Sequence, residues 1–212
     1  LKPYLINYIM KTIQHFVNGK SFSGESKRTG KIFNPATGEQ EAEVKLATTK
    51  DINEAVANAK DAFDAWASTP QLQRARVMFK FKELIEKNSD ELTKIIVAEH
   101  GKVYEDAKGS LTRGLEVVEY ACGIPQMLKG EFTENVGTNV DSWSIRQPLG
   151  VCAGITPFNF PAMVPMWMFP MAIACGNTFV LKPSEKDPSC SMRLAELLKE
   201  AGLPDGVFNV VN

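Results

Sequence analysis

The order of apolar and polar residues divides the chain into a β-rich start, a helical middle and an end in which strands and helices alternate. In the first part, Asn18-Gly19 stands between two short runs in 15–22, as in a tight hairpin turn. The ranges 31–34 and 40–46 predict two more short strands around a turn at 35–38. We therefore expect a small β region ahead of the first helix.

Apolar residues recur every three or four positions from residue 52 to residue 128, which predicts four helices. Thr49 and Ser89 are expected to cap the first and third helices, Pro70 to separate the first two, and Gly101 to follow the third. The fourth would run from about Tyr104 to Leu128. The predicted inward faces carry Ile52, Val56, Ala59, Phe63 and Trp66; Val77, Phe81, Leu84 and Ile85; Leu92, Ile95 and Ile96; and Ala107, Leu111, Leu115, Val118 and Cys122.

The last third alternates short apolar strands with helices. Strands are predicted at 149–155, 178–181 and 207–211, and helices at 161–175, apolar on all sides, and from Pro188 to Ala201 with Asp187 as its cap. Such alternation requires parallel pairing through right-handed crossovers. The fold class is therefore α/β: the first half of a Rossmann-type parallel sheet, preceded by a β-hairpin and a helical block. The third strand would lie at an unpaired edge, so we interpret the chain as truncated.

Two further segments complete the predicted organisation. Trp143 and Ile145 alternate with polar residues as in a half-buried strand, and 131–147 would form a projecting hairpin ahead of the β-α-β-α-β unit at 148–212. Residues 1–11 lack the apolar core of a signal peptide. We interpret them as a leader that is not native, with Met10 as a candidate start, ahead of a single region at 12–212.

Charge and composition exclude several classes of protein. The 24 basic and 25 acidic residues give a net charge of −1, which disfavours binding to nucleic acid or to anionic lipid. The stretch between Arg146 and Lys182 is uncharged, but its five prolines would break hydrogen bonds that lipid cannot replace. The four cysteines form no C-x-x-C pair, so we expect free thiols and no metal site.

Candidate chemistry follows the first two strands of the alternating region. The turn at 154–161 lacks the G-x-G-x-x-G fingerprint of dinucleotide sites but contains Asn159, and Lys182, Ser184 and Glu185 follow the next strand. Ligands of such sheets bind at the carboxyl ends of the strands. A Lys–Glu pair there can hydrogen-bond the hydroxyls of a diol. An incidental ion pair in a solvated turn is the alternative.

Three strings of residues resemble the aldehyde dehydrogenase superfamily: GITPFNFP at 154–161, GNTFVLKPSE at 176–185 and AGLPDGVFNVV at 201–211. The turn NPATG at 34–38 fits the same family. The longer string PFNFPAMVPMWMFP at 157–170 resembles its CoA-acylating branch, the methylmalonate-semialdehyde dehydrogenases. The resemblance covers about residues 12–212, with Phe158 where most of the superfamily has tryptophan.

The resemblance implies roles for individual residues on the turns after the first two strands. Asn159 would donate its side-chain amide to the oxyanion, with a helix N-cap as the alternative role. Thr156 and Phe158 would line the NAD site. Lys182 and Glu185 would hold the adenosine ribose, and Lys186, where the branch often has arginine, would be a further cofactor contact.

Arg113 matches an arginine of this branch that recognises the substrate carboxylate, a task for which the two-pronged guanidinium is suited. An ordinary helix-face pair with Glu116 is the alternative. The nucleophilic cysteine and the glutamate of the catalytic domain are not matched in this chain. The four cysteines, at 122, 152, 175 and 190, stand outside the family's nucleophile motif. We therefore expect the chain alone to be inactive.

For the whole enzyme, the resemblance implies NAD-dependent oxidation of methylmalonate or malonate semialdehyde, with CoA as co-substrate and propionyl-CoA or acetyl-CoA and CO2 as products. It also implies a place in valine or inositol catabolism, a homotetramer joined through 131–147, and a cytoplasmic location, or the mitochondrial matrix in a eukaryote. Two alternatives stay open: a non-acylating NAD(P)-dependent semialdehyde dehydrogenase, and a non-catalytic dinucleotide-binding or assembly fragment.

Overall fold

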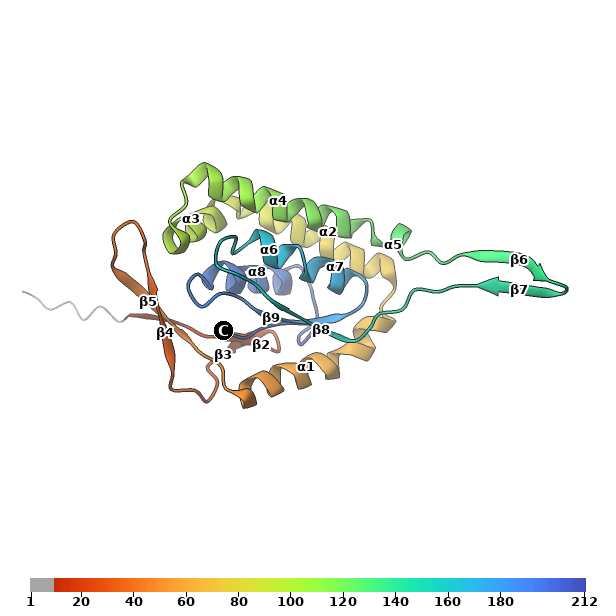
Figure 1. Cartoon of the computed structure of the whole chain (residues 1–212), viewed down its shortest axis with the longest axis horizontal. Helices are drawn as coiled ribbons and strands as arrows, with labels where there is room; N and C mark the ends of the chain where they lie inside the picture. Colours follow the sequence, from red (N-terminus) through yellow and green to blue (C-terminus); the bar gives the residue numbers. More distant parts are fainter. Residues whose placement is uncertain (1–9) are drawn as a thin grey trace, which may run out of the picture.

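A computed structural model describes residues 10–212 and shows a mixed sheet with helices on both faces (Figure 1). Its strand order is β3-β2-β10-β9-β8. The strands are β2 (His15–Val17), β3 (Lys20–Phe22), β8 (Val151–Ile155), β9 (Thr178–Lys182) and β10 (Phe208–Val210). The last three are parallel, as predicted, which confirms the α/β fold class.

The third parallel strand, β10, does not lie at an edge of the sheet, contrary to the prediction. The hairpin β2–β3 supplies the missing neighbour, because β2 pairs antiparallel with β10 through Val210 and Phe16. The hairpin turn is the predicted one: Asn18 and Gly19 have φ of 52° and 71°, the left-handed values that such a turn requires.

A second sheet, of order β1-β5-β4, lies beside the first. Its strands are β1 (Lys11–Ile13), β4 (Thr29–Phe33) and β5 (Gln40–Lys45), and the last two form the predicted antiparallel pair. β1 was not predicted, because three residues carry no readable period. It begins at Lys11, inside the range interpreted as a leader; residues 1–9 of that range lie outside the described part.

The helical block consists of α1 (Thr49–Ser68), α2 (Gln71–Lys87), α3 (Ser89–His100), α4 (Tyr104–Cys122) and the short α5 (Ile124–Met127). Two predicted caps are wrong by one residue. Thr48, not Thr49, caps α1 in a reciprocal capping box with Asp51, and Asn88, not Ser89, stands at the start of α3. The predicted fourth helix is split, because the helical path of α4 ends at Gly123.

The inward face of α1 was predicted partly wrongly. Ala59 and Trp66 are buried as expected, but Ile52 and Val56 are 42% and 40% exposed, and Ala55 is buried in their place. The alanines face Val17, Val180 and Val211 of the sheet, where small side chains allow the helix to approach closely. Close packing of the small alanine side chains therefore decides which face of α1 is buried, although the face with Ile52 and Val56 is more apolar.

The predicted helix at 161–175 is two short ones, α6 (Met163–Met166) and α7 (Phe169–Ala174). Pro170 lacks the N–H that would continue α6, and it stands at the start of α7, where a proline is tolerated. Trp167, at the break, is exposed, so this segment is not covered on every side. The following helix, α8 (Ser189–Glu200), begins after Pro188, and the predicted cap Asp187 makes no capping hydrogen bond.

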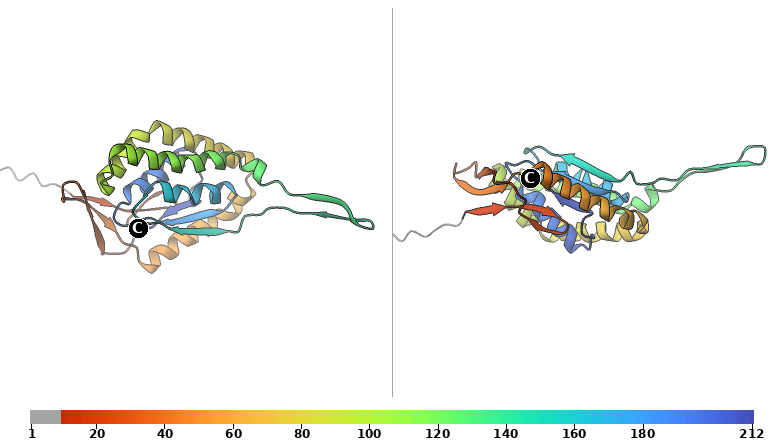
Figure 2. Two further views of the ribbon diagram at one scale, coloured as in Figure 1. Left: turned by 45° about the horizontal axis from the view of Figure 1, so that its top comes forward. Right: turned by 90° about the horizontal axis from the view of Figure 1, so that it is seen from below.

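The helices form separate layers around the sheet (Figures 1 and 2). α1 covers one face, while α7 and α8 cover the other, and α2, α3 and α4 form an outer layer beyond them. Phe169 links the layers, since its ring lies 6.0 Å from that of Phe81 on α2 and 4.6 Å from that of Phe208 on β10.

The segment 131–147 projects from the body as the antiparallel hairpin β6 (Phe132–Gly137) and β7 (Val140–Trp143), as predicted (Figures 1 and 2). Its strands are exposed along their whole length, and Trp143 is 67% exposed. The expectation of a half-buried strand is thus wrong within this chain, because no other element of residues 10–212 packs against the arm.

Candidate cofactor and active site

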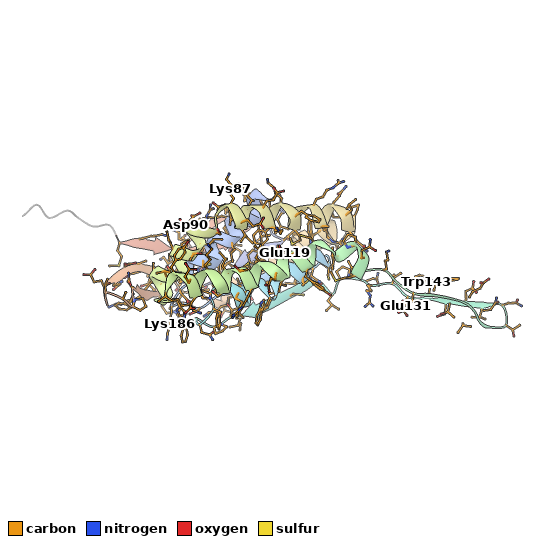
Figure 3. All side chains as sticks on the ribbon, turned by 90° about the horizontal axis from the view of Figure 1, so that it is seen from above. Lys87, Asp90, Glu119, Glu131, Trp143 and Lys186 are labelled. Carbon is orange, nitrogen blue, oxygen red and sulfur yellow. The ribbon has the colours of Figure 1, made fainter. Side chains whose placement is uncertain are left out.

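The candidate site lies where β8 and β9 end side by side. Ile155 pairs with Lys182 in the parallel register, and the Thr156 N–H donates to the Lys182 carbonyl at 3.0 Å. The turns that follow the two strands therefore leave the sheet together, which brings the two predicted groups of site residues to one edge. Lys186 lies at the end of the molecule opposite to Trp143 of the arm (Figure 3).

Lys182 and Glu185 form an ion pair, with 2.9 Å between Nζ and Oε2. The hydrogen bond from Lys182 lowers the pKa of the Glu185 carboxyl, so the glutamate is a ready acceptor at neutral pH. Both side chains stay partly exposed. The pair thus presents a donor and an acceptor, 2.9 Å apart, to a ligand such as a vicinal diol.

Thr156 is a second feature that points to a ligand. The residue is buried, yet its hydroxyl has no hydrogen-bond partner among residues 10–212. Buried hydroxyls are normally paired, and an unpaired one calls for an explanation. Because the Thr156 N–H donates to the Lys182 carbonyl, this unpaired hydroxyl belongs to the same edge of the sheet as the Lys182–Glu185 pair.

Phe158 extends from this edge and remains half exposed. The ammonium of Lys186 lies 4.6 Å from the centroid of the Phe158 ring. The centroid of the His100 ring, at the end of α3, lies 6.3 Å from the same point. Lys186 is therefore brought to the site as expected, but its contact within this chain is with the Phe158 ring, a cation–π interaction.

A cavity of about 400 Å³ adjoins Phe158 and Lys186, and its other lining residues are Lys31, Phe33, Pro35, Glu99, His100 and Asp187. Burial raises the pKa of Asp187 to about 7, and the carboxylate of Glu99 adds to the rise. Burial also raises the pKa of Glu99, although its Oε2 accepts a hydrogen bond of 3.0 Å from the Ser189 N–H at the start of α8. These two acids were missed because only the folded chain places α3 beside the start of α8.

Asp187 should make the stability of the chain pH-dependent. Its pKa is raised on folding, so the unfolded chain ionises first and the free energy of unfolding falls as pH rises from about 4 to about 7. We expect Asp187→Asn to raise that free energy at pH 8 by ~4 kcal/mol and to change it by less than ~1 kcal/mol at pH 4. Urea unfolding at both pH values measures the difference, with the exposed Asp61→Asn as control. An equal gain at pH 4 and pH 8 would contradict the assignment.

Asn159 is exposed on the irregular segment between β8 and α6, and none of the hydrogen bonds among residues 10–212 involves its amide. The N-cap position of α6 is occupied by Ala162. The alternative role of Asn159 as a helix cap is therefore wrong. Its side-chain N–H groups are free to donate to a ligand at this edge.

Arg113 is exposed on α4, and within the described part of the chain it forms no ion pair with Glu116 or another acid. The next residue, Gly114, lies where α4 packs closely against α6. A Cβ atom added to this glycine would lie only 3.2 Å from the Cα of Met163. The helix-face pair with Glu116 is thus not formed. The charge of Arg113 is available near the segment that carries Asn159.

The four cysteines are free, as expected: Cys122 and Cys190 are buried in the core, and Cys152 and Cys175 are half-buried and pack against it. Burial raises the pKa of each thiol, most strongly that of Cys190. A raised pKa keeps a thiol protonated at neutral pH and therefore poorly nucleophilic. None of the four is a candidate nucleophile.

A larger crevice of about 590 Å³ lies between β1, α3 and α8 and contains none of the predicted site residues. No helix in residues 10–212 combines the length and apolarity needed to cross a membrane. The same residues contain no group of three or more side chains arranged to hold a metal ion.

Comparison with known proteins gives a consistent result. The family model described as the aldehyde dehydrogenase family matches residues 22–212. A malonate-semialdehyde dehydrogenase of Pseudomonas aeruginosa is 55% identical over 96% of this chain. A mitochondrial methylmalonate-semialdehyde dehydrogenase of Arabidopsis thaliana, named as acylating, is 53% identical over 94% of it. The chain spans only 41% and 33% of the length of these two relatives.

Solved structures agree with this match. A protein of Sinorhizobium meliloti described as a methylmalonate-semialdehyde dehydrogenase, in complex with NAD, superposes with a TM-score of 0.95 at 55% identity. The match covers 97% of this chain and 42% of that one. The methylmalonate-semialdehyde dehydrogenase of Oceanimonas doudoroffii gives a TM-score of 0.94 at 60% identity, over 96% of this chain and 41% of that one.

Proposed function

The chain belongs to the aldehyde dehydrogenase family, and from that membership we propose that it forms the NAD-binding part of a semialdehyde dehydrogenase that transfers its acyl product to CoA. The observation that carries the proposal is the 55% and 53% identity to relatives named for malonate and methylmalonate semialdehyde. The proposal concerns the whole enzyme, meaning this chain continued by the remaining part that those relatives possess.

The site residues fit NAD. Lys182 and Glu185 would hold the two ribose hydroxyls, Thr156 would donate its unpaired hydroxyl, and Phe158 with Lys186 would line the edge of the site. NAD, when bound, supplies the hydride acceptor. The NAD complex of the Sinorhizobium meliloti protein supports this choice of cofactor.

Asn159 and Arg113 would act on the substrate. In the whole enzyme, a thiolate outside this chain would add to the aldehyde carbon, and the Asn159 amide would stabilise the negative oxygen without changing its own charge. Arg113 would hold the substrate carboxylate through its guanidinium. Since the four cysteines here are protonated, we expect residues 1–212 alone to form no NADH.

The overall reaction balances with CoA as the acyl acceptor. Methylmalonate semialdehyde, NAD and CoA would give propionyl-CoA, CO2 and NADH, and malonate semialdehyde would give acetyl-CoA. The C–C bond to the carboxylate breaks, and its electrons pass toward the thioester carbonyl. From the family resemblance, we propose a place for this reaction in valine or inositol catabolism.

A non-acylating semialdehyde dehydrogenase is the second candidate function. It is compatible with the Pseudomonas aeruginosa relative, which is named simply as a malonate-semialdehyde dehydrogenase. The acylating function is preferred here because the Arabidopsis thaliana relative, at a similar identity, is named as acylating.

The arm would join subunits. Its exposed apolar residues, Phe132, Val136, Val140 and Trp143, lie on two strands that have no neighbour in residues 10–212. Apolar surface of this kind is typical of protein–protein interfaces. We propose a homo-oligomer, with four subunits as in the family resemblance.

The cofactor assignment predicts a loss of NAD affinity on changing Glu185. Glutamine can still accept through its amide oxygen but lacks the charge of the carboxylate, and hydrogen bonds to charged groups are stronger than neutral ones by about 1–1.5 kcal/mol. Glu185→Gln should therefore raise the Kd for NAD about 5- to 15-fold in the whole enzyme. Calorimetric titration of the variant with NAD measures this Kd. Lys80 and Glu83 on α2 form an ion pair with the same spacing and the same 2.9 Å distance, so Glu83→Gln is a matched control. Equal Kd values for the two variants would refute the ribose role of Glu185.

A further inference from the structure

Lys102 is a charged residue near the site for which neither the fold nor the proposed function gives a role. It follows Gly101, whose φ of 82° ends α3 and turns the chain away from the helix. Its Nζ lies 3.7 Å from the centroid of the Phe160 ring. Phe160 directly follows Asn159 in the chain.

The segment 156–162, which carries Asn159, has few other anchors. At one end the Thr156 N–H donates to the Lys182 carbonyl, and at the other the carbonyls of Phe160, Pro161 and Ala162 accept from Val164, Ser191 and Met166. None of the hydrogen bonds in residues 10–212 involves the residues between, 157–159. Asn159 itself makes no hydrogen bond in the described part of the chain. The aromatic side chains on either side of Asn159 are each held by a lysine, Lys186 over Phe158 and Lys102 over Phe160.

The surroundings of Lys102 explain why its ammonium stays on the ring. The side chain is half-buried and forms no ion pair of 4 Å or less with an acid of residues 10–212. Burial lowers the pKa of its ammonium, the carboxylates of Asp106 and Asp187 oppose that shift, and the charge of Arg113 adds to it. The contact left to this cation is the negative face of an aromatic ring.

We propose that Lys102 is a positioning residue for Asn159, acting through the ring of Phe160 to hold the oxyanion-binding amide in place. This inference rests on the proposed function for the role of Asn159. The contact also joins the end of α3 to the segment before α6, so it links the helical block to the site.

The first test needs no activity. In hydrogen exchange on the 212-residue chain, Lys102→Met should make the backbone amide of Val164, which donates to the Phe160 carbonyl, exchange about 3- to 30-fold faster, the factor that corresponds to losing one cation–π contact. Lys102→Arg, which keeps a cation on the ring, should restore the slow rate. Lys94→Met, an exposed lysine elsewhere on the same helical block, is the control. Unchanged exchange in Lys102→Met would overturn the proposal.

The second test separates positioning from general stability. In the whole enzyme, Lys102→Met should lower kcat for propanal about 3- to 30-fold and leave the Kd for NAD unchanged. In an Asn159→Ala background, the same change should have no further effect on kcat, because no amide remains to be positioned.

The outcomes distinguish this inference from the proposed function. If Asn159→Ala lowers kcat and Lys102→Met lowers it again by the same factor in that background, Lys102 acts elsewhere and the inference is wrong. If Asn159→Ala leaves kcat unchanged, the oxyanion role of the proposed function fails, and positioning for catalysis fails with it. Faster exchange of the Val164 amide in that case would still show the physical contact between Lys102 and Phe160.

Discussion

Asn159→Ala is expected to lower kcat of the whole enzyme about 10²- to 10³-fold, the usual cost of losing one oxyanion donor, with the Kd for NAD unchanged. The structure favours a large effect for a specific reason. The amide of Asn159 is exposed and makes no hydrogen bond in the described part of the chain, and the cap of the following helix is Ala162. Its removal should therefore disturb no folded contact.

Two variants make this measurement specific to the donor. Asn159→Asp keeps the size of the side chain but removes both N–H donors, so it should be at least as damaging as alanine. Asn53→Ala changes an exposed asparagine of α1 and should leave steady-state kinetics as they are. A loss of less than about threefold for Asn159→Ala would remove Asn159 from the oxyanion site.

Arg113→Leu is expected to lower kcat/KM for methylmalonate semialdehyde about 10- to 150-fold and to spare propanal, which has no carboxylate. The factor corresponds to losing one charged hydrogen-bond pair. Arg113 is exposed on α4 and pairs with no acid of residues 10–212, so its loss should cost little stability.

The test of the carboxylate role is the difference between the losses of kcat/KM for the two aldehydes. Arg76→Leu, which changes an exposed arginine of α2, serves as the control for the loss of a positive charge. If Arg113→Leu lowers kcat/KM equally for both aldehydes, Arg113 does not recognise the carboxylate, and a general aldehyde dehydrogenase becomes the better description.

Periodicity was enough to predict most elements, but not which side of each is buried. The stripes of α1 show the reason: Ile52 and Val56 are more apolar than Ala55, yet the alanine stripe faces the sheet because it allows close approach. The apolar run at 161–175 predicted one helix, whereas the prolines divide it into α6 and α7. Both outcomes depend on tertiary packing, which a local pattern does not contain.

Some residues of the candidate site could be predicted from the sequence, and others could not. Lys182, Glu185 and Asn159 could be predicted because parallel strands place their following turns at one edge. The strands do meet there, through Thr156 and Lys182. Asp187, Glu99 and Lys102 could not, because their environments arise from contacts between α3 and segments more than fifty residues away in the chain.

The most direct test of the proposed function is the dependence of the whole enzyme on CoA. Methylmalonate semialdehyde and NAD would be supplied with and without CoA, and the products identified by mass spectrometry. The account predicts one propionyl-CoA and one CO2 for each NADH formed, and little NADH without CoA. Rapid NADH formation without CoA, with free methylmalonate as the product, would contradict it.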